Sequence, residues 1–188
     1  MEPTENKVKK PFWTRERYLQ ILALLFVVAL SVLLVINRAR VAELEGYGYL
    51  GIFIISIISS ASIVLPVPSW ILVATLGGIL NPILVGVVSG IGGTIGEMTG
   101  YLLGYGGRLA IENVPLYNRM VKWMTKWGSA TIFVLALIPN PLFDVAGAAA
   151  GLLRFPVWKF IVFGAAGRIP KNIFFAYLGA WGLHFLPM

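Results

Sequence analysis

Four ionisable side chains lie within long apolar stretches of the sequence: Glu97, Asp144, Arg168 and Lys171. A charge at membrane depth costs at least a few kcal/mol, so such residues typically mark substrate paths or proton relays. Arginine binds phosphate oxygens through paired hydrogen bonds, and lysine offers the same oxygens a point charge. The four side chains are therefore candidates for a polar pathway through the membrane.

Each of these side chains also has a structural interpretation. Glu97 either responds to protons, neutralises Arg168 or Lys171, or lies at the end of a span. The two cations either bind phosphate or extend to the membrane surface. Asp144 follows a proline-rich turn, where its carboxylate can cap the next helix. Asn140 within that turn is expected to satisfy backbone groups, and it is a further candidate for this pathway.

Two Pro-x-Pro turns interrupt the apolar sequence. Proline lacks an N–H and clashes with the preceding helical turn, so it ends or kinks a helix. Lipid cannot satisfy the freed carbonyl groups, and a broken helix at membrane depth must be covered by protein or line a wet cavity. We interpret the four prolines as the tips of two hairpins: Pro66 and Pro68, then Pro139 and Pro141.

The arms around these turns are short. Residues 49–65 and 70–80 flank the first turn and contain 17 and 11 residues, whereas a spanning helix needs about 20. Ser69 is placed to cap the second of these arms. The apolar segment 129–153 has the same pattern. The sequence predicts two re-entrant hairpins rather than pairs of full spans.

A glycine-rich span is predicted at Ile83–Gly104. Gly92, Gly96, Gly100 and Gly104 put one glycine per helical turn on a single face, a pattern that allows close helix contact. Glu97 lies near the middle of this span. A last apolar segment runs over 157–186, with a predicted interruption at Gly167-Arg168-Ile169-Pro170-Lys171.

The composition is that of an integral membrane protein: 58% of the 188 residues are hydrophobic and 12% are charged, where soluble domains carry about 25% charged residues. The chain has no cysteine and one histidine, His184, which excludes disulfides, thiol catalysis and a histidine-rich metal site. No nucleophile–base pair is evident, so we expect neither an enzyme nor a cofactor.

Basic residues give the chain a net charge of +7 and flank the apolar segments, a pattern that sets topology rather than nucleic-acid binding. Residues 1–17 are predicted to form a cytoplasmic tail, and 18–188 a single membrane domain. Residues 18–36 form a first span; a cleaved signal peptide is the alternative. Residues 108–128 are predicted to form a basic amphipathic helix on an anionic leaflet, or else a solvated connector packed on the bundle.

The two halves share a spacing. Pro66 and Pro139 are 73 residues apart, and so are Gly78 and Gly151. Each hairpin leads into a span that carries ionisable groups. With a cytoplasmic N-terminus the two units are inverted, which is typical of transporters. The predicted fold is an all-α integral membrane protein with two inverted repeats, each a re-entrant hairpin plus a transmembrane helix. Six ordinary spans with proline kinks are the alternative.

Four motifs, in this order, resemble the DedA/VTT-domain (SNARE-associated Golgi protein) family: LPVPS…GG at 65–78, GxxxGExxGYxxG at 92–104, IPNPLFDVAGAAAG at 138–151 and GRIPKNIFFAYLG at 167–179. The resemblance covers about residues 47–182. It implies two facing re-entrant hairpins and lipid translocation. Its VTT members resemble phospholipid scramblases, and its bacterial DedA members resemble flippases for undecaprenyl phosphate or phosphatidylethanolamine that are linked to the proton gradient.

The sequence departs from the DedA pattern in both hairpins. Residues 139–144 read PNPLFD, where DedA proteins carry a P-G-x-R pattern with arginines. The acidic residue of the first hairpin is absent, and serines occupy that arm at positions 56, 59, 60 and 62. Glu97, followed by Tyr101, matches the aspartate of the family's G-D-x-x-x-Y pattern.

These observations lead to an expected function, membrane lipid translocation by a scramblase or flippase-like transporter. The expected partners are phospholipids or polyprenyl phosphate, with anionic lipid at 108–128, no nucleic acid, and a possible homo-oligomer. The expected location is a prokaryotic inner membrane. An ion- or proton-coupled small-solute transporter and a non-transporting assembly or scaffold protein are the alternatives.

Overall fold

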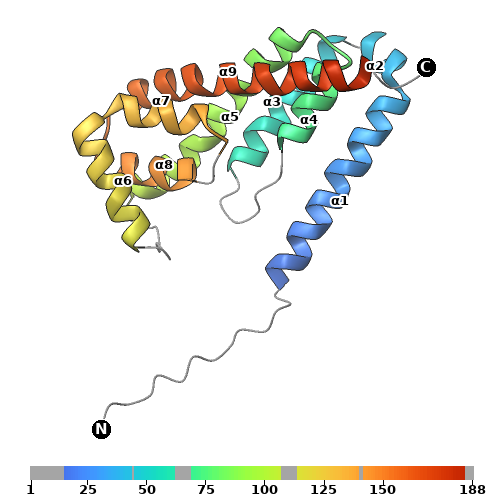
Figure 1. Cartoon of the computed structure of the whole chain (residues 1–188). Coiled ribbons are helices and arrows are strands. Elements are labelled where there is room, and N and C mark those ends of the chain that lie inside the picture. Colours follow the sequence, from blue (N-terminus) through green and yellow to red (C-terminus); the bar gives the residue numbers. More distant parts are fainter. Residues whose placement is uncertain (1–14, 44, 62–68, 107–113, 140–141, 185–188) are drawn as a thin grey trace.

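The computed structural model describes residues 15–43, 45–61, 69–106, 114–139 and 142–184. Within these ranges all regular structure is helical (Figure 1). The helices are α1 (Arg15–Ile36), α2 (Arg38–Glu43), α3 (Glu45–Ala61), α4 (Ser69–Gly77), α5 (Pro82–Tyr105), α6 (Val114–Trp127), α7 (Ser129–Leu137), α8 (Leu142–Leu152) and α9 (Val157–His184).

Helix α5 has clear start signals. The Asn81 side chain accepts hydrogen bonds from the backbone N–H groups of Ile83 and Leu84, at 3.0 and 3.3 Å. Pro82 occupies the first helical position, where its missing N–H costs nothing. Among the described residues, α5 is the one helix that is both long and apolar enough to cross a bilayer. Its 24 residues contain the span predicted at 83–104.

Helix α9 corrects one prediction. The sequence predicted an interruption at 167–171, but α9 runs without a break for 28 residues, with Pro170 inside it. Contacts on both sides of the proline explain why the helix continues. Arg168 is paired with a side chain of α5, and Asn172 donates a hydrogen bond to Ser89 of the same helix. Spanning helices tolerate proline where neighbouring helices supply such contacts.

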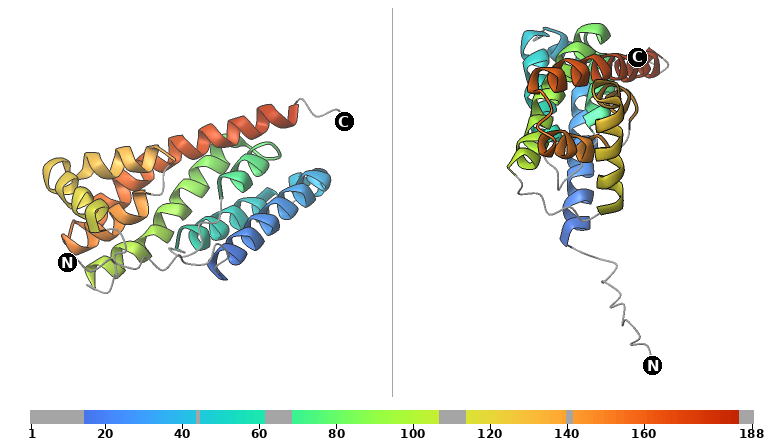
Figure 2. Two further views of the ribbon diagram at one scale, coloured as in Figure 1. Left: turned by 60° about the horizontal axis from the view of Figure 1, so that its bottom comes forward. Right: turned by 90° about the vertical axis from the view of Figure 1, so that its left-hand side faces the viewer.

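The helices pack in a reciprocal pattern around α5 and α9, which cross each other (Figure 2). Helix α3 packs along α5, and α7 packs along α9. The helices that follow the two Pro-x-Pro turns are α4 and α8, which we call the return arms. Each packs on the long helix of the other half: α4 packs on α9, and α8 packs on α5. Residues 62–68 and 140–141 lie outside the described ranges, and they include four of the residues predicted at the hairpin tips: Pro66, Pro68, Asn140 and Pro141.

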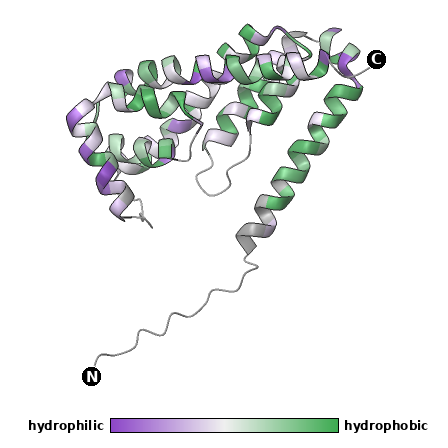
Figure 3. Ribbon diagram, in the orientation of Figure 1, coloured by the Kyte–Doolittle hydropathy of each residue, from purple (hydrophilic) through white to green (hydrophobic). Residues whose placement is uncertain are grey.

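Three of the helices that belong to the predicted hairpins are short. Helices α4 and α7 have nine residues each and α8 has eleven, fewer than the roughly 20 that cross a bilayer. Their re-entrant course stays a prediction. Helix α1 is hydrophobic along most of its length (Figure 3). Many of its apolar side chains are exposed, as expected of a surface that faces lipid tails rather than water.

Helix α6 has one buried stripe and one basic face. Met120 and Met124 are buried and join the apolar cluster of α7 and α8. Arg119, Lys122 and Lys126 are exposed. The helix therefore packs on the bundle through its methionines, inside the amphipathic segment predicted at 108–128. Residues 107–113 lie outside the described ranges, and the contact of α6 with anionic lipid stays a prediction.

The end of α8 yields a testable stability prediction. Arg154 has φ 50°, a left-handed backbone conformation. The N–H groups of Arg154 and Phe155 donate to the carbonyls of Gly151 and Ala150, both at 2.9 Å, as in a helix end that normally uses glycine. Because side chains disfavour this conformation, Arg154→Gly is expected to raise the free energy of unfolding by about 1 kcal/mol. Thermal unfolding in detergent measures the change.

The control for this variant is Arg154→Ala. It keeps a Cβ in the left-handed conformation and removes the guanidinium that lies 5.5 Å from the centre of the Tyr105 ring. We expect the alanine variant to be no more stable than wild type. Equal losses in both variants would show that the arginine contact matters more than the backbone strain.

Candidate functional site

The four ionisable residues that the sequence singles out come together between three helices. Glu97 belongs to α5, Asp144 lies in the first turn of α8, and Arg168 and Lys171 lie one turn apart on α9. They are close enough for their charges to interact with one another. Two acids and two bases thus form a cluster with no formal net charge inside an apolar bundle.

Arg168 is the centre of this cluster. Its Nη2 donates to Glu97 Oε1, and its Nη1 donates to Ser60 Oγ of α3 at 2.9 Å. The guanidinium also lies over the Phe143 ring, 5.0 Å from its centre. Its Nε is buried and has no hydrogen-bond partner among the described residues. Arg168 of α9 therefore contacts α3, α5 and α8, and its Nε–H remains available to a further hydrogen-bond acceptor.

Glu97 is almost completely buried, with 3% of its surface exposed. A buried carboxylate needs a cation or hydrogen-bond donors, because hydrocarbon cannot solvate the charge. Arg168 supplies both, and the carboxyl group of Asp144 also lies near Glu97. Gly147 of α8 lies beside this carboxyl group: a Cβ there would be 3.9 Å from Glu97 Oε2, which is ordinary van der Waals contact.

Glycines on two faces of α5 bring its neighbours near. Gly92 and Gly96 face α3: a Cβ on Gly92 would lie 2.7 Å from the Phe53 carbonyl oxygen. Gly100 and Gly104 face α8. A second set, which sequence reasoning missed, faces α9: a Cβ on Gly90 would lie 2.7 Å from the Ile169 side chain, and Gly86 and Gly93 face the same helix.

A second polar contact between α5 and α9 was also missed. Asn172 Nδ2 donates to the buried Ser89 Oγ at 3.0 Å. Asn172 lies four residues after Arg168, so both side chains project from one face of α9. This four-residue spacing is the feature of the sequence from which the contact could have been predicted. Together with the ion pair, this contact makes a polar seam along the crossing of α5 and α9.

Of the residues predicted at the hairpin tips, Ser69 and Pro139 lie within the described ranges. Ser69 is the first residue of α4 and is half-buried, and Pro139 is exposed just after α7. Pro66, Pro68, Asn140 and Pro141 are not among the described residues. No group of three histidine, cysteine, aspartate or glutamate side chains that could hold a metal occurs in the described part of the chain.

Comparison with known proteins identifies the family to which the chain belongs. A family model described as the VTT domain matches residues 67–181, a range that contains all four charged residues and both return arms. The chain belongs to the DedA/VTT-domain family. Helix α1 lies outside the matched range. No solved structure matches the chain significantly.

Curated relatives of this DedA/VTT-domain chain come from bacteria and a plant. "Undecaprenyl phosphate transporter A" of Bacillus subtilis is 34% identical over 148 residues, which cover 72% of each chain. An uncharacterized protein of Haemophilus influenzae is 26% identical over 99 residues, 49% of this chain and 51% of that protein. "Vacuole membrane protein KMS1" of Arabidopsis thaliana is 36% identical over 55 residues, 27% of this chain and 13% of that protein.

Proposed function

We propose that this DedA/VTT-domain protein moves a lipid with a phosphate headgroup, polyprenyl phosphate or a phospholipid, across the bacterial cytoplasmic membrane. The observation that carries the proposal is the meeting of Glu97, Asp144, Arg168 and Lys171 inside an apolar helical bundle. A phosphate in hydrocarbon lacks both hydrogen-bond donors and counter-charge. This cluster offers both, and the Bacillus relative is named as a transporter of such a lipid.

The reciprocal packing supports a two-repeat mechanism. In the proposed arrangement, α3–α4–α5 and α7–α8–α9 are inverted repeats with the N-terminus in the cytoplasm. Each return arm then packs on the span of the other repeat, α4 on α9 and α8 on α5. Glycines occupy equivalent contacts: Gly104 faces the Ala148 backbone, and Gly179 faces the Ala74 backbone. Broken helices from two inverted repeats that meet near the bilayer midplane are typical of transporters.

Lys171 is the proposed first contact for the phosphate. It lies one turn from Arg168 on α9, and the cluster gives it no ion pair as short as that of Arg168. Arg168 is held by Glu97 and Ser60, so a phosphate that passed Lys171 would compete with Glu97 for the guanidinium. Binding must also be weak enough for release. The two acids of the cluster keep phosphate binding weak, because an arriving phosphate has to displace a carboxylate from its cation.

The test compares two lysines of α9 in liposomes that hold purified protein. Lys171→Gln removes the proposed headgroup contact and keeps the Glu97–Arg168 pair, whereas Lys159→Gln removes an α9 lysine next to Trp158. Loss of one charged hydrogen bond is expected to slow translocation about tenfold in the first variant and to leave the second near wild type. Dithionite bleaching of a fluorescent phospholipid reports scrambling, and a fluorescent short-chain polyprenyl phosphate reports carrier transport.

Comparing the movement of the two lipids distinguishes a scramblase from a selective transporter. Movement of both indicates a scramblase, and movement of the polyprenyl phosphate alone indicates a selective transporter. If wild-type protein moves neither lipid, the lipid-transport proposal is wrong, and the solute-transporter or scaffold alternatives replace it. Equal rates for the two lysine variants would remove Lys171 from the path.

A further inference from the structure

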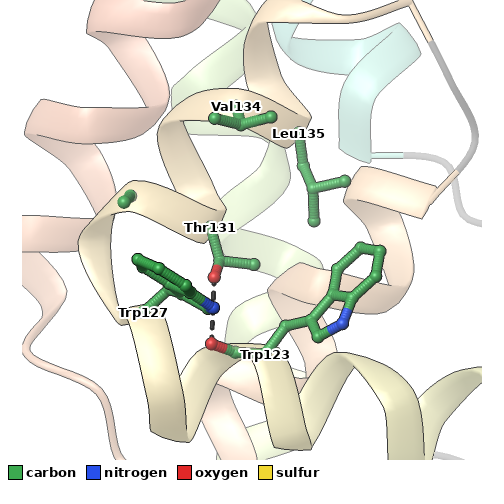
Figure 4. Close-up of a pocket in the computed structure, with 6 residues that line it drawn as sticks. Trp123, Trp127, Thr131, Val134 and Leu135 are labelled. Carbon is green, nitrogen blue, oxygen red and sulfur yellow. Dashed lines mark hydrogen bonds between the residues drawn. The ribbon is translucent and has the colours of Figure 1, made fainter.

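A groove with almost purely apolar walls runs between α6 and α7, apart from the charged cluster. Its volume is about 250 Å³, and Figure 4 shows its lining. The described residues that line it are Trp123, Trp127, Ala130, Thr131, Val134 and Leu135. The lining includes none of the four charged residues of the candidate site, so the groove is distinct from that cluster.

Hydrogen bonds fix the corner between the two helices. Gly128 joins them with φ 49° and ψ −116°, a positive-φ conformation that glycine adopts and that other residues avoid. Its N–H donates to the Met124 carbonyl at 2.9 Å. Thr131 Oγ1 donates to the Trp123 carbonyl at 3.0 Å, across the base of the groove (Figure 4). The groove is therefore preformed, and an occupant need not order it.

A lysine lies beside one of the two tryptophans that line the groove. Lys126 Nζ lies 5.4 Å from the centre of the Trp127 ring, and Trp127 itself lines the groove with 63% of its surface exposed. Arg119 and Lys122 are exposed on the same helix. Tryptophan and lysine side by side are typical of the membrane–water boundary, where the ring sits among headgroups and the ammonium meets lipid phosphates.

We propose that this groove binds one anionic phospholipid, with an acyl chain between α6 and α7 and its phosphate at Lys126. An acyl chain matches the apolar walls, and the phosphate matches the charge at the rim. The bound lipid would stay with the protein and hold α6 at the membrane surface. It is thus a separate ligand from the lipid that passes the charged cluster, and this proposal does not depend on transport.

Native mass spectrometry with added phosphatidylglycerol or phosphatidylcholine of identical acyl chains tests the proposal. Wild-type protein is expected to retain one phosphatidylglycerol in preference to phosphatidylcholine. Lys126→Gln is expected to weaken phosphatidylglycerol binding about fivefold, the effect of one cation near an anionic lipid. Ala130→Phe fills the groove from an exposed position and is expected to weaken binding of both lipids.

Lys159→Gln is the matched control, because Lys159 Nζ lies 5.5 Å from the centre of the Trp158 ring, and the groove lining does not include this pair. It is expected to bind phosphatidylglycerol like wild type. Equal losses in the two lysine variants would overturn the proposal, since they would reflect general attraction to a basic protein. Unchanged binding in Ala130→Phe would overturn it too, because the chain would then lie elsewhere. Size-exclusion profiles confirm that each variant is folded.

Discussion

Arg168→Gln is expected to lower the free energy of unfolding by about 3–5 kcal/mol, the usual cost of leaving a buried charge without its partner. Glu97 has 3% of its surface exposed, and its carboxylate accepts a hydrogen bond from the Arg168 guanidinium. Glutamine cannot supply the missing positive charge. Unfolding of purified protein in mixed micelles, followed by circular dichroism as sodium dodecyl sulfate is added, measures the loss.

The double variant Glu97→Gln/Arg168→Gln separates structure from transport. It removes both charges together and leaves two amides that can bond to each other, so most of the lost stability is expected to return. If Arg168 also binds phosphate, the double variant folds but still translocates lipid slowly. A double variant as unstable as Arg168→Gln would show that the ion pair is not the main contribution of Arg168 to the fold.

Gly96→Ala is expected to lower the free energy of unfolding by about 1–3 kcal/mol, as overpacking of a filled interior does. A Cβ on Gly96 would lie 2.8 Å from the Ser60 Cβ and 3.0 Å from the Ala61 nitrogen. Helix α3 would have to move away from α5. Such a shift would also lengthen the hydrogen bond from Arg168 to Ser60, so lipid translocation is expected to fall with stability.

Gly100→Ala is the matched control on the same helix. A Cβ on Gly100 would meet one atom, the Asp144 carbonyl oxygen at 3.8 Å, which is ordinary contact. Because alanine favours helix, we expect stability unchanged or raised by up to about 1 kcal/mol. The same detergent titration compares the two variants. Equal effects at positions 96 and 100 would contradict the packing argument, which assigns the cost to the approach of α3.

Much of the architecture can be predicted from sequence because charge and proline stand out against apolar residues. Asn81-Pro82 and the apolar run after it indicate the start of α5, and the methionine and lysine spacing indicates α6. Glu97 and Arg168 were identifiable as site candidates for the same reason. Which cation pairs with Glu97 was not, because Arg168 and Lys171 lie one turn apart and only the rotation of α9 distinguishes them.

Small residues explain most of what was missed. Glycine and serine fit lipid-facing, buried and polar positions alike, so Ser60 and Ser89 carry no signal of their partners until the helices are placed. Gly86 and Gly90 face α9 although the regular spacing of the other glycines drew attention to a different face of α5. The continuity of α9 through Pro170 depends on contacts to α5 that lie more than 70 residues away in sequence.

The exchange of return arms has a consequence for how the chain is made. Helix α4 packs on α9, the last described helix, so its partner emerges about 100 residues later. At 5–20 residues per second the wait is roughly 5–20 s. During that interval Gly77, whose place in the bundle is against Ala176, has no helix to cover it. The packing of α4 is therefore completed only after α9 has been made, and chains truncated before α9 present an unfinished surface to quality-control proteases.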